Sequence, residues 1–459
     1  MALTPLPLKV KLAYGMGELA GAVPVSLAAF FLLYFFTSVV GLSPALAGSI
    51  LLLGRVWDAI NDPIVGWLSD RTRSRLGRRY PWMVYGAIPL ALCCTLLWVV
   101  PPLERQSSLF LYYGLLSLAI YVAFTAVQLP FTALAAELTP DYDERTSLMG
   151  IKAGFSIGGS LAALVLAQIV FAQVSQPRQQ YLILGLISSG VAVVAIAVCV
   201  MGTYRRYWQV ESLRLERTSP PPVPLATQLH SLVQNQAFRQ VLGLYLFAWM
   251  GVQVTAAMLP YFVDSWMGLP ETHFAQMALA VQSTALVAMV GWSWLGHRAE
   301  KRTLFLLGAP ISIVCLLCLV TVQPAQVSWM YALAVGVGIG VSTLYLAPFA
   351  MLPDVIDLDE LHTGQRREGL YFSAVVFLQK LGLAIALFLS GQVLEWTGFS
   401  AQAAQQPAAA LWAVRLLLGP IPALLLAASL WFAWRYPISR RKHQEILLSL
   451  NARQEQQNS

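Results

Sequence analysis

Long blocks of apolar residues, separated by short polar stretches, follow one another along the chain. About 20 apolar residues in a helix cross the hydrocarbon core of a bilayer. Twelve blocks reach this length, at 11–37, 43–69, 82–101, 108–136, 147–173, 181–202, 240–263, 273–296, 303–322, 328–352, 369–394 and 410–435. The pattern predicts an all-α polytopic membrane protein with twelve transmembrane helices.

The composition agrees with this pattern and excludes a water-soluble domain. Hydrophobic residues make up 58% of the chain, charged residues 11%, and the mean hydropathy is +0.65. The net charge of +7 comes mostly from Lys and Arg in alternate loops, such as Lys9 and Lys11 before the first span. By the positive-inside rule both termini are expected in the cytoplasm, with the protein in the plasma membrane or, in a Gram-negative cell, the inner membrane. The placement of Lys and Arg in cytoplasmic loops explains the positive net charge better than nucleic-acid binding does.

Several other classes of protein lack support in the sequence. The five cysteines lie in apolar blocks, so no disulfide framework is expected, and the five scattered histidines show no metal-site spacing. No G-x-x-x-x-G-K-[ST] loop for a nucleotide-driven pump occurs. We therefore expect no cofactor other than a coupling cation.

The chain divides into two halves that resemble each other. A polar stretch at 204–238, with the run Ser219 to Pro222, predicts a cytoplasmic linker between residues 1–203 and 239–436, with a tail at 437–459. Pro130-Phe131 with Leu134 returns 218 positions later as Pro348-Phe349 with Leu352, and acidic loops follow both. Parallel repeats of six spans, with a solute site where the halves meet, are typical of alternating-access transporters.

The second apolar block contains charges that a membrane helix normally avoids. Asp58 and Asp62 are four residues apart, so they share one helix face, bordered by Asn61 and Arg55. Charges at this depth are costly, and they indicate a functional site or an interhelical ion pair with Arg55 or Lys380 that fixes packing. We favour function, because two carboxylates, an amide and a nearby hydroxyl suit Na⁺ or a proton.

These residues carry a family resemblance. The segment from Arg55 to Pro63, with Tyr14 to Glu18 before it and Gly77 to Trp82 after it, resembles the glycoside-pentoside-hexuronide:cation symporters, the melibiose-carrier branch of the major facilitator superfamily. Arg366-Arg367-Glu368-Gly369 and Gln379-Lys380-Leu-Gly382 are similar to the same family. The resemblance covers about residues 9–435. It implies the major facilitator fold and cation-coupled symport of a sugar or glycoside-type solute by alternating access.

The resemblance also implies roles for individual residues. The cation ligands become Asp58, Asp62, Asn61 and Thr125. Lys380 matches the lysine that borders this site, and with Arg55 it is expected to balance the carboxylates when the cation leaves. Na⁺, Li⁺ and H⁺ all remain open as the coupling ion.

The sequence departs from the family at the two acids that bind the sugar. The aligned positions are Ala22 and Gln128, so galactoside recognition of that type is in doubt, although the Gln128 amide could bind a polar solute or a neighbouring helix. Glu18, one turn before Ala22, is a further candidate for solute contact or gating. A largely apolar first span makes a lysophospholipid or other amphiphile an alternative solute. A membrane-embedded enzyme, with Asp357-Leu-Asp359-Glu360 as its nearest acidic motif, is less favoured.

Charged residues at the cytoplasmic ends of the spans form a last group. Salt bridges and helix-end contacts there are expected to hold an inward gate closed, with solvated loops as the alternative. The candidate gating residues are Asp70, Arg71, Arg78, Arg79, Asp141, Arg145, Asp354 and Arg367. The stretch RRKHQEILLSLNARQ predicts an amphipathic helix at the membrane surface. We expect a monomer whose partners are the bilayer and a small-molecule solute.

Overall fold

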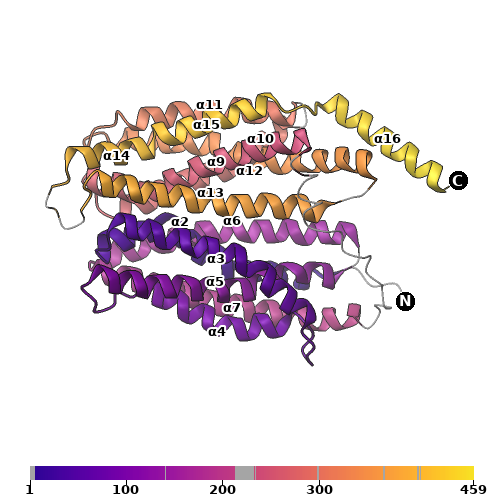
Figure 1. Ribbon diagram of the computed structural model, residues 1–459, viewed down its shortest axis with the longest axis horizontal. Coiled ribbons are helices and arrows are strands. Elements are labelled where there is room, and N and C mark those ends of the chain that lie inside the picture. Colours follow the sequence, from indigo (N-terminus) through magenta and orange to yellow (C-terminus); the bar gives the residue numbers. More distant parts are fainter. Residues whose placement is uncertain are drawn as a thin grey trace. The chain divides into compact units, whose positions relative to one another are not determined.

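A computed structural model (Figure 1) describes residues 6–139, 141–211, 232, 234–296, 299–364, 367–400, 403 and 405–458. Throughout these residues the regular structure is helical, with no strand. The N-terminal helices are α1 (Leu8–Gly17), α2 (Leu19–Tyr34), η1 (Phe35–Val39), α3 (Pro44–Arg71), α4 (Tyr80–Leu97), α5 (Gln106–Leu138), α6 (Tyr142–Gln173) and α7 (Pro177–Glu211). The C-terminal helices are α9 (Gln236–Tyr261), η2 (Phe262–Trp266), α10 (Thr272–Gly296), α11 (Lys301–Leu319), α12 (Val327–Thr363), α13 (Glu368–Trp396), α14 (Ala408–Leu418), α15 (Pro420–Trp434) and α16 (Arg440–Asn458).

The helices confirm the predicted all-α membrane architecture. Among the described residues, eleven helical segments have the length and apolar character of a membrane span. The predicted span at 43–69 corresponds to α3, whose 28 residues are long enough to cross a bilayer but which is not among the eleven. The site proposed from the sequence therefore lies in a helix that is less apolar than the other predicted spans.

The chain forms two compact units. Unit 1 comprises Met1–Ser219, Pro270–Gln276 and Leu387–Ala410, and unit 2 comprises Pro220–Leu269, Met277–Ala386 and Leu411–Ser459. Two segments from the predicted second half, at 270–276 and 387–410, thus belong to unit 1. Helix α7 continues to Glu211 and α9 begins at Gln236, so both edges of the predicted linker are helical. Its proline run lies outside the described residues.

Within unit 1, α3 packs mainly against α5. Helix α5 contacts both α3 and α4, while α7 contacts α1, α2 and α4. Ser43 caps α3 by accepting a hydrogen bond from the Leu46 amide at 3.5 Å, and Pro44 fills the first turn, where no intrahelical donor is needed. Pro63 stands inside the same helix and removes one backbone hydrogen bond next to Asp62.

Two glycines let the backbones of α3 and α13 touch within unit 1. A Cβ atom added at Gly391 would lie 2.4 Å from the carbonyl oxygen of Pro44, and one added at Gly48 would lie 3.0 Å from that of Phe388. Beside this crossing, the Ala45 amide donates to Glu395 at 3.2 Å. Side chains larger than hydrogen would force the two helices apart here.

Helix α16 packs on α12 within unit 2 and is drawn in yellow in Figure 1. Ile446 and Leu450 are buried, while Leu448 is exposed. The predicted helix after the last span is therefore present, and the face with Ile446 and Leu450 is buried within the protein. Its predicted contact with the membrane surface stays a prediction.

Candidate cation site and helix-end ion pairs

The two aspartates of α3 meet a single hydroxyl of α5. Thr125 Oγ1 lies 3.2 Å from Asp58 Oδ1 and 3.0 Å from Asp62 Oδ1. Asp58 and Thr125 are 1% and 2% exposed. The helices approach closely at this level, because a Cβ atom at Gly54 would lie 2.3 Å from Ser117 Oγ. The structure thus brings together three of the four ligands that the family resemblance implies.

Arg55 and Asn61 border this cluster. Arg55 Nη1 lies 3.9 Å from Asp58 Oδ2, and its guanidinium stands over the Tyr121 ring at 5.3 Å from the centroid. Asn61 is 5% exposed, and its Nδ2 donates to the Tyr121 carbonyl oxygen at 3.4 Å. This bond turns the amide nitrogen toward α5 and leaves Oδ1 as the atom of Asn61 that could ligate a cation.

The cluster has an unusual proton balance. A threonine hydroxyl has one proton, yet Thr125 Oγ1 is within hydrogen-bonding distance of two carboxylate oxygens. When both carboxylates are ionised, one of these contacts brings lone pairs together, and the two negative charges repel in a buried environment. A proton on one carboxylate, or a monovalent cation between the oxygens, relieves both problems.

The remaining candidates are the charge-balancing Lys380 and the solute residues Glu18, Ala22 and Gln128. Lys380 belongs to the part of α13 in unit 2, and its predicted role stays a prediction. Glu18, between α1 and α2, pairs with Lys152 of α6 at 3.5 Å. Lys152 was not among the residues selected from the sequence, where it reads as a loop charge.

The two positions aligned with the family's sugar-binding acids lie in tight packing. A Cβ atom at Gly159 of α6 would lie 2.9 Å from the Ala22 Cβ. The amide of Gln128 fits against Gly21, where an added Cβ would lie 2.2 Å from Nε2. Gln128 Oε1 is buried, with no hydrogen-bond partner among the described residues. An unsatisfied buried acceptor is a group that a hydroxyl-bearing ligand could satisfy.

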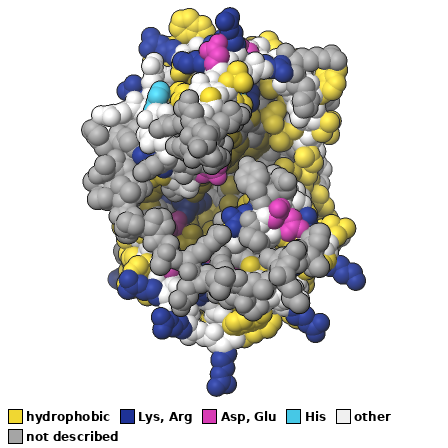
Figure 2. All heavy atoms as spheres, turned by 90° about the vertical axis from the view of Figure 1, so that its right-hand side faces the viewer, with side chains coloured by type: hydrophobic (Ala, Val, Ile, Leu, Met, Phe, Trp, Pro, Cys, Tyr) yellow, Lys and Arg dark blue, Asp and Glu magenta, His cyan; other side chains and the backbone are white. Residues whose placement is uncertain are grey.

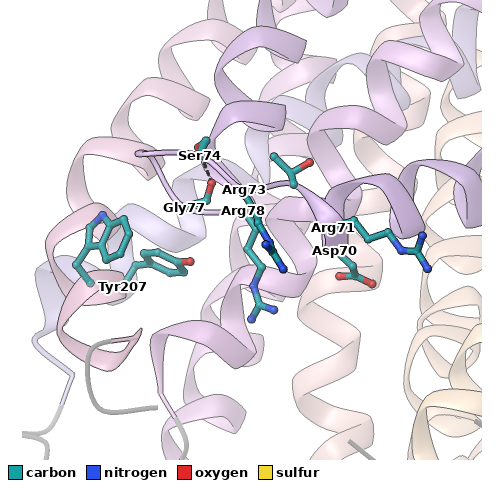
Figure 3. Close-up of a pocket in the computed structure, with 9 residues that line it drawn as sticks. Asp70, Arg71, Arg73, Ser74, Gly77, Arg78 and Tyr207 are labelled. Carbon is teal, nitrogen blue, oxygen red and sulfur yellow. Dashed lines mark hydrogen bonds between the residues drawn. The ribbon is translucent and has the colours of Figure 1, made fainter. Parts of the chain in front are cut away.

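A charged cluster lies at the adjoining ends of α3 and α5 in unit 1, and Figure 3 draws two of its members, Asp70 and Arg78. Arg79 contacts Asp70, donates to Ser69 Oγ at 2.7 Å, and donates to Glu137 Oε1 at 3.0 Å. Arg78 reaches the same carboxylate at 3.2 Å. Glu137 is 3% exposed and was not selected from the sequence. The sequence did contain a signal for this residue. Glu137 is an acid at the end of the fourth apolar block, and arginines of another loop could neutralise it.

Three other gating candidates of unit 1 make contacts of a different kind. Arg71 stacks on Trp67, with 4.1 Å between its guanidinium carbon and the ring centroid. Asp141 caps α6 by accepting from the Glu144 amide at 2.8 Å, and Arg145 donates to the Thr139 carbonyl oxygen at 2.9 Å. Asp141 and Arg145 therefore make helix-end contacts.

Unit 2 has its own ion pairs at the end of α12. Lys301 Nζ lies 2.6 Å from Asp354, and Arg367 makes a bidentate contact with Asp359 at 2.6 and 3.0 Å. The hydrogen bonds to Asp359 raise the pKa of Arg367 above its usual value. His443 Nε2 of α16 lies 3.0 Å from Asp357 and 3.3 Å from Asp354. His443 was missed because nothing in its local sequence indicates this contact. Arg366, noted in the sequence, lies outside the described residues.

Comparisons with known proteins agree with the fold and the motif. A family model described as MFS/sugar transport protein matches residues 13–440. The uncharacterized symporter sll1374 of Synechocystis sp. is 40% identical over 97% of both chains. The putative glycoside/cation symporter YagG of Escherichia coli is 30% identical, covering 93% of this chain and 91% of its own. The sodium-dependent lysophosphatidylcholine symporter 1-A of Danio rerio is 26% identical, covering 97% and 89%.

Solved structures show the same fold. The crystal structure of a bacterial homologue of the iron transporter ferroportin, in an inward-facing state, matches with a TM-score of 0.66 and 16% identity, covering 94% of this chain and all of that one. The family model and the relatives place the chain among major facilitator proteins, and the relatives and structures that match are transporters rather than enzymes. The chain belongs to the MFS/sugar transport protein family. The comparisons support a cation-coupled symporter within that class.

Proposed function

We propose that this protein is a secondary active transporter in which Na⁺ or H⁺ binds between Asp58 and Asp62 and drives symport of a sugar or glycoside-type solute. The observation that carries the proposal is the contact of both carboxylates, buried Asp58 and half-buried Asp62, with the one hydroxyl of Thr125. Two ionised carboxylates and one hydroxyl proton are mismatched, and a bound cation corrects the mismatch.

The coupling follows from the same electrostatics. With the cation bound, the site is close to neutral and α3 can hold its packed position against α5. Without it, the excess negative charge attracts Arg55, which already lies 3.9 Å from Asp58. If the cation binds better in the conformation that also binds the solute, each ligand raises the affinity for the other by the same factor.

The proposed class of solute is supported by the names of relatives and by residues 18 to 22 and 128. The name of YagG favours a glycoside, and the buried, unpartnered Gln128 Oε1 suits a hydroxyl donor. A lysophospholipid is the second candidate. It is favoured by the Danio rerio relative's name and by the absence of a carboxylate at Ala22, which packs on α6.

The helix-end ion pairs are proposed as gate elements. Arg79 with Asp70 and Glu137 in unit 1, and Arg367 with Asp359 in unit 2, are pairs whose strength would differ between open and closed states. Pairs that form in only one state shift the equilibrium toward that state.

Purified protein in proteoliposomes tests the proposal. An inward Na⁺ gradient and an inward proton gradient are imposed separately, and accumulation of radiolabelled glycosides and lysophosphatidylcholine is measured. We expect one gradient to drive accumulation above equilibrium, and Asp62→Asn to abolish it. Glu104→Gln removes an exposed carboxylate outside the site and is the matched control. Undiminished gradient-driven accumulation in Asp62→Asn would overturn the cation assignment.

A further inference from the structure

Arg55 of α3 is a positive charge beside the proposed cation site. Its Nη1 lies 3.9 Å from Asp58 Oδ2, while Asp58 Oδ1 faces the hydroxyl of Thr125 at 3.2 Å. The two oxygens of one carboxylate are therefore turned to different neighbours, the guanidinium and the hydroxyl. Among the residues that the structure describes, Arg55 makes no hydrogen bond and meets no second carboxylate.

Tyr121 of α5 holds the guanidinium at this distance. Its ring centroid lies 5.3 Å from the Arg55 guanidinium carbon, within the range of a cation–π contact. The ring is fixed against α3, because a Cβ atom added at Gly54 would lie 2.5 Å from its Cε2. Contact with the ring thus offers Arg55 an alternative to a close ion pair with Asp58.

The partly buried position of Arg55 makes its charge effective. Figure 2 shows Lys and Arg side chains that stand out from the surface, where water and salt screen their charges. Arg55 exposes 21% of its side chain and faces a carboxylate whose side chain is 1% exposed. Screening between these two groups is weaker, so Arg55 acts on any ion that Asp58 holds.

The oxygen ligands of the site do not by themselves distinguish monovalent from divalent cations. Carboxylate, hydroxyl and amide oxygens are also the ligands that Ca²⁺ and Mg²⁺ prefer. A repelling charge does distinguish them, because the Coulomb energy is proportional to the charge of the bound ion. Arg55 therefore opposes a divalent ion twice as strongly as a monovalent ion in the same position.

We propose that Arg55, positioned by Tyr121, is a specificity-determining residue that restricts the site to monovalent cations. The inference rests on the proposed function, because it concerns the ion that Asp58 and Asp62 hold. It gives the guanidinium a role while the ion is bound, in addition to charge balance after the ion leaves. Arg55 acts without ligating the ion, through the electrostatic field at Asp58.

Cation binding to the purified full chain tests the proposal. The shift in Tm is measured during titrations with NaCl, with CaCl₂ and with acid, at an ionic strength held constant with choline chloride. The variants are Arg55→Gln, Arg55→Lys and Tyr121→Leu. The control is Arg105→Gln, which removes an exposed arginine from the loop before α5. Size-exclusion elution and Tm without added ions verify that each variant is folded.

Loss of the charge should change two affinities by different factors. Arg55→Gln should raise the affinity for Na⁺, or for the proton if protons stabilise the wild type, about tenfold, as removal of a like charge within about 4 to 6 Å implies. The affinity for Ca²⁺ should rise about a hundredfold, because doubling the charge of the ion squares the factor. Arg55→Lys and Arg105→Gln should keep the wild-type preference for the monovalent ion.

Tyr121→Leu should act in the opposite direction. It removes the ring but keeps the Tyr121 carbonyl position that accepts from Asn61, so Arg55 can close on Asp58. The affinity for the monovalent ion should then fall about threefold. Opposite effects of two substitutions at touching side chains are not expected from structural damage alone.

Two results would overturn the proposal. One is a rise of the Na⁺ and Ca²⁺ affinities by the same factor in Arg55→Gln, or no rise in either. The other is a Ca²⁺ response gained by Lys380→Gln and not by Arg55→Gln. The Ca²⁺ response gained in Arg55→Gln should disappear in Arg55→Gln/Asp62→Asn. If the wild type and Asp62→Asn respond alike to every cation, the proposed cation site itself is wrong, which separates that failure from failure of the role of Arg55.

Discussion

Helices α5 and α12 are related by the internal repeat, and their midpoints differ. Thr125 of α5 and Thr343 of α12 are 218 positions apart, the same offset as Pro130 and Pro348, and both threonines are buried. Thr125 faces two carboxylates of α3, whereas Thr343 donates to its own helix, to the Gly340 carbonyl oxygen at 2.7 Å. The same residue at the same place in the repeat serves a candidate ion site in one unit and helix packing in the other.

The partner helices explain the difference. The positions of α10 that match Asp58 and Asp62 at this offset are Gln276 and Ala280. Thr343 instead packs against Gly308 of α11, where an added Cβ would lie 2.3 Å from its Cγ2, and its hydroxyl donates to a backbone carbonyl of its own helix, as Ser and Thr commonly do in membrane helices. In the proposed mechanism, the ion chemistry therefore belongs to one half, although the two threonines occupy the same place in the repeat.

The ends of the two helices that carry the ion pairs are alike in kind. Glu137 of α5 receives Arg78 and Arg79, and Asp354 of α12 receives Lys301 and His443. Both acids are nearly inaccessible to water. The repeat-related helices thus differ in the middle and correspond at the end.

The largest expected effect concerns these ends. Glu137→Gln leaves Arg78 and Arg79 without their shared carboxylate, and should reduce stability by about 2 to 4 kcal/mol. Asp354→Asn should cost less, about 1 to 2 kcal/mol, because Lys301 is 41% exposed and solvent screens its charge. Thermal unfolding in detergent measures both. Glu445→Gln, in an exposed pair with Arg441, is the control and should leave Tm unchanged. If Glu137→Gln behaves like that control, the buried cluster does not stabilise this end.

The second prediction tests the difference between the two threonines, Thr125 and Thr343. Thr125→Val removes the hydroxyl between Asp58 and Asp62, and should raise the half-saturating cation concentration about tenfold, as a loss of about 1.5 kcal/mol implies. Thr343→Val is the matched control in the other unit and should leave cation affinity unchanged. Cation-dependent stabilisation of purified protein is the measurement. Equal effects of the two substitutions would mean that the cation site is not confined to α3 and α5.

The smallest expected effect concerns a contact that α12 has and α5 lacks. His443→Gln weakens the attachment of α16 to Asp354 and Asp357, so cleavage within α16 by trypsin should accelerate about fivefold through local opening. His362→Gln, an exposed histidine of α12, is the control. An unchanged cleavage rate would show that Ile446 and Leu450 hold the helix without the histidine.

The sequence predicted contacts well where they depend on position within one helix. Asp58 and Asp62 share a face because they are four residues apart, and their charge within an apolar block made them candidates for a site. Thr125 became a candidate ligand only through the family resemblance. Glu137, Lys152 and His443 were missed, since their partners lie 58, 134 and 89 residues away and the rotation of each helix decides the contact. In helices that are apolar on every side, the sequence pattern indicates that rotation poorly.

The carboxylates of α3 also affect how the protein is made. At the centre of a membrane helix, each Asp or Arg opposes insertion by about 2.5 to 3.5 kcal/mol, so α3 is a poor substrate for the translocon on its own. Its polar face becomes acceptable to the bilayer once α5, synthesised later, presents Thr125 and the Tyr121 carbonyl. We therefore expect α3 to stay near the insertion machinery until α5 emerges. The two helices would then enter the lipid as a pair, with the candidate ion site assembled during biogenesis.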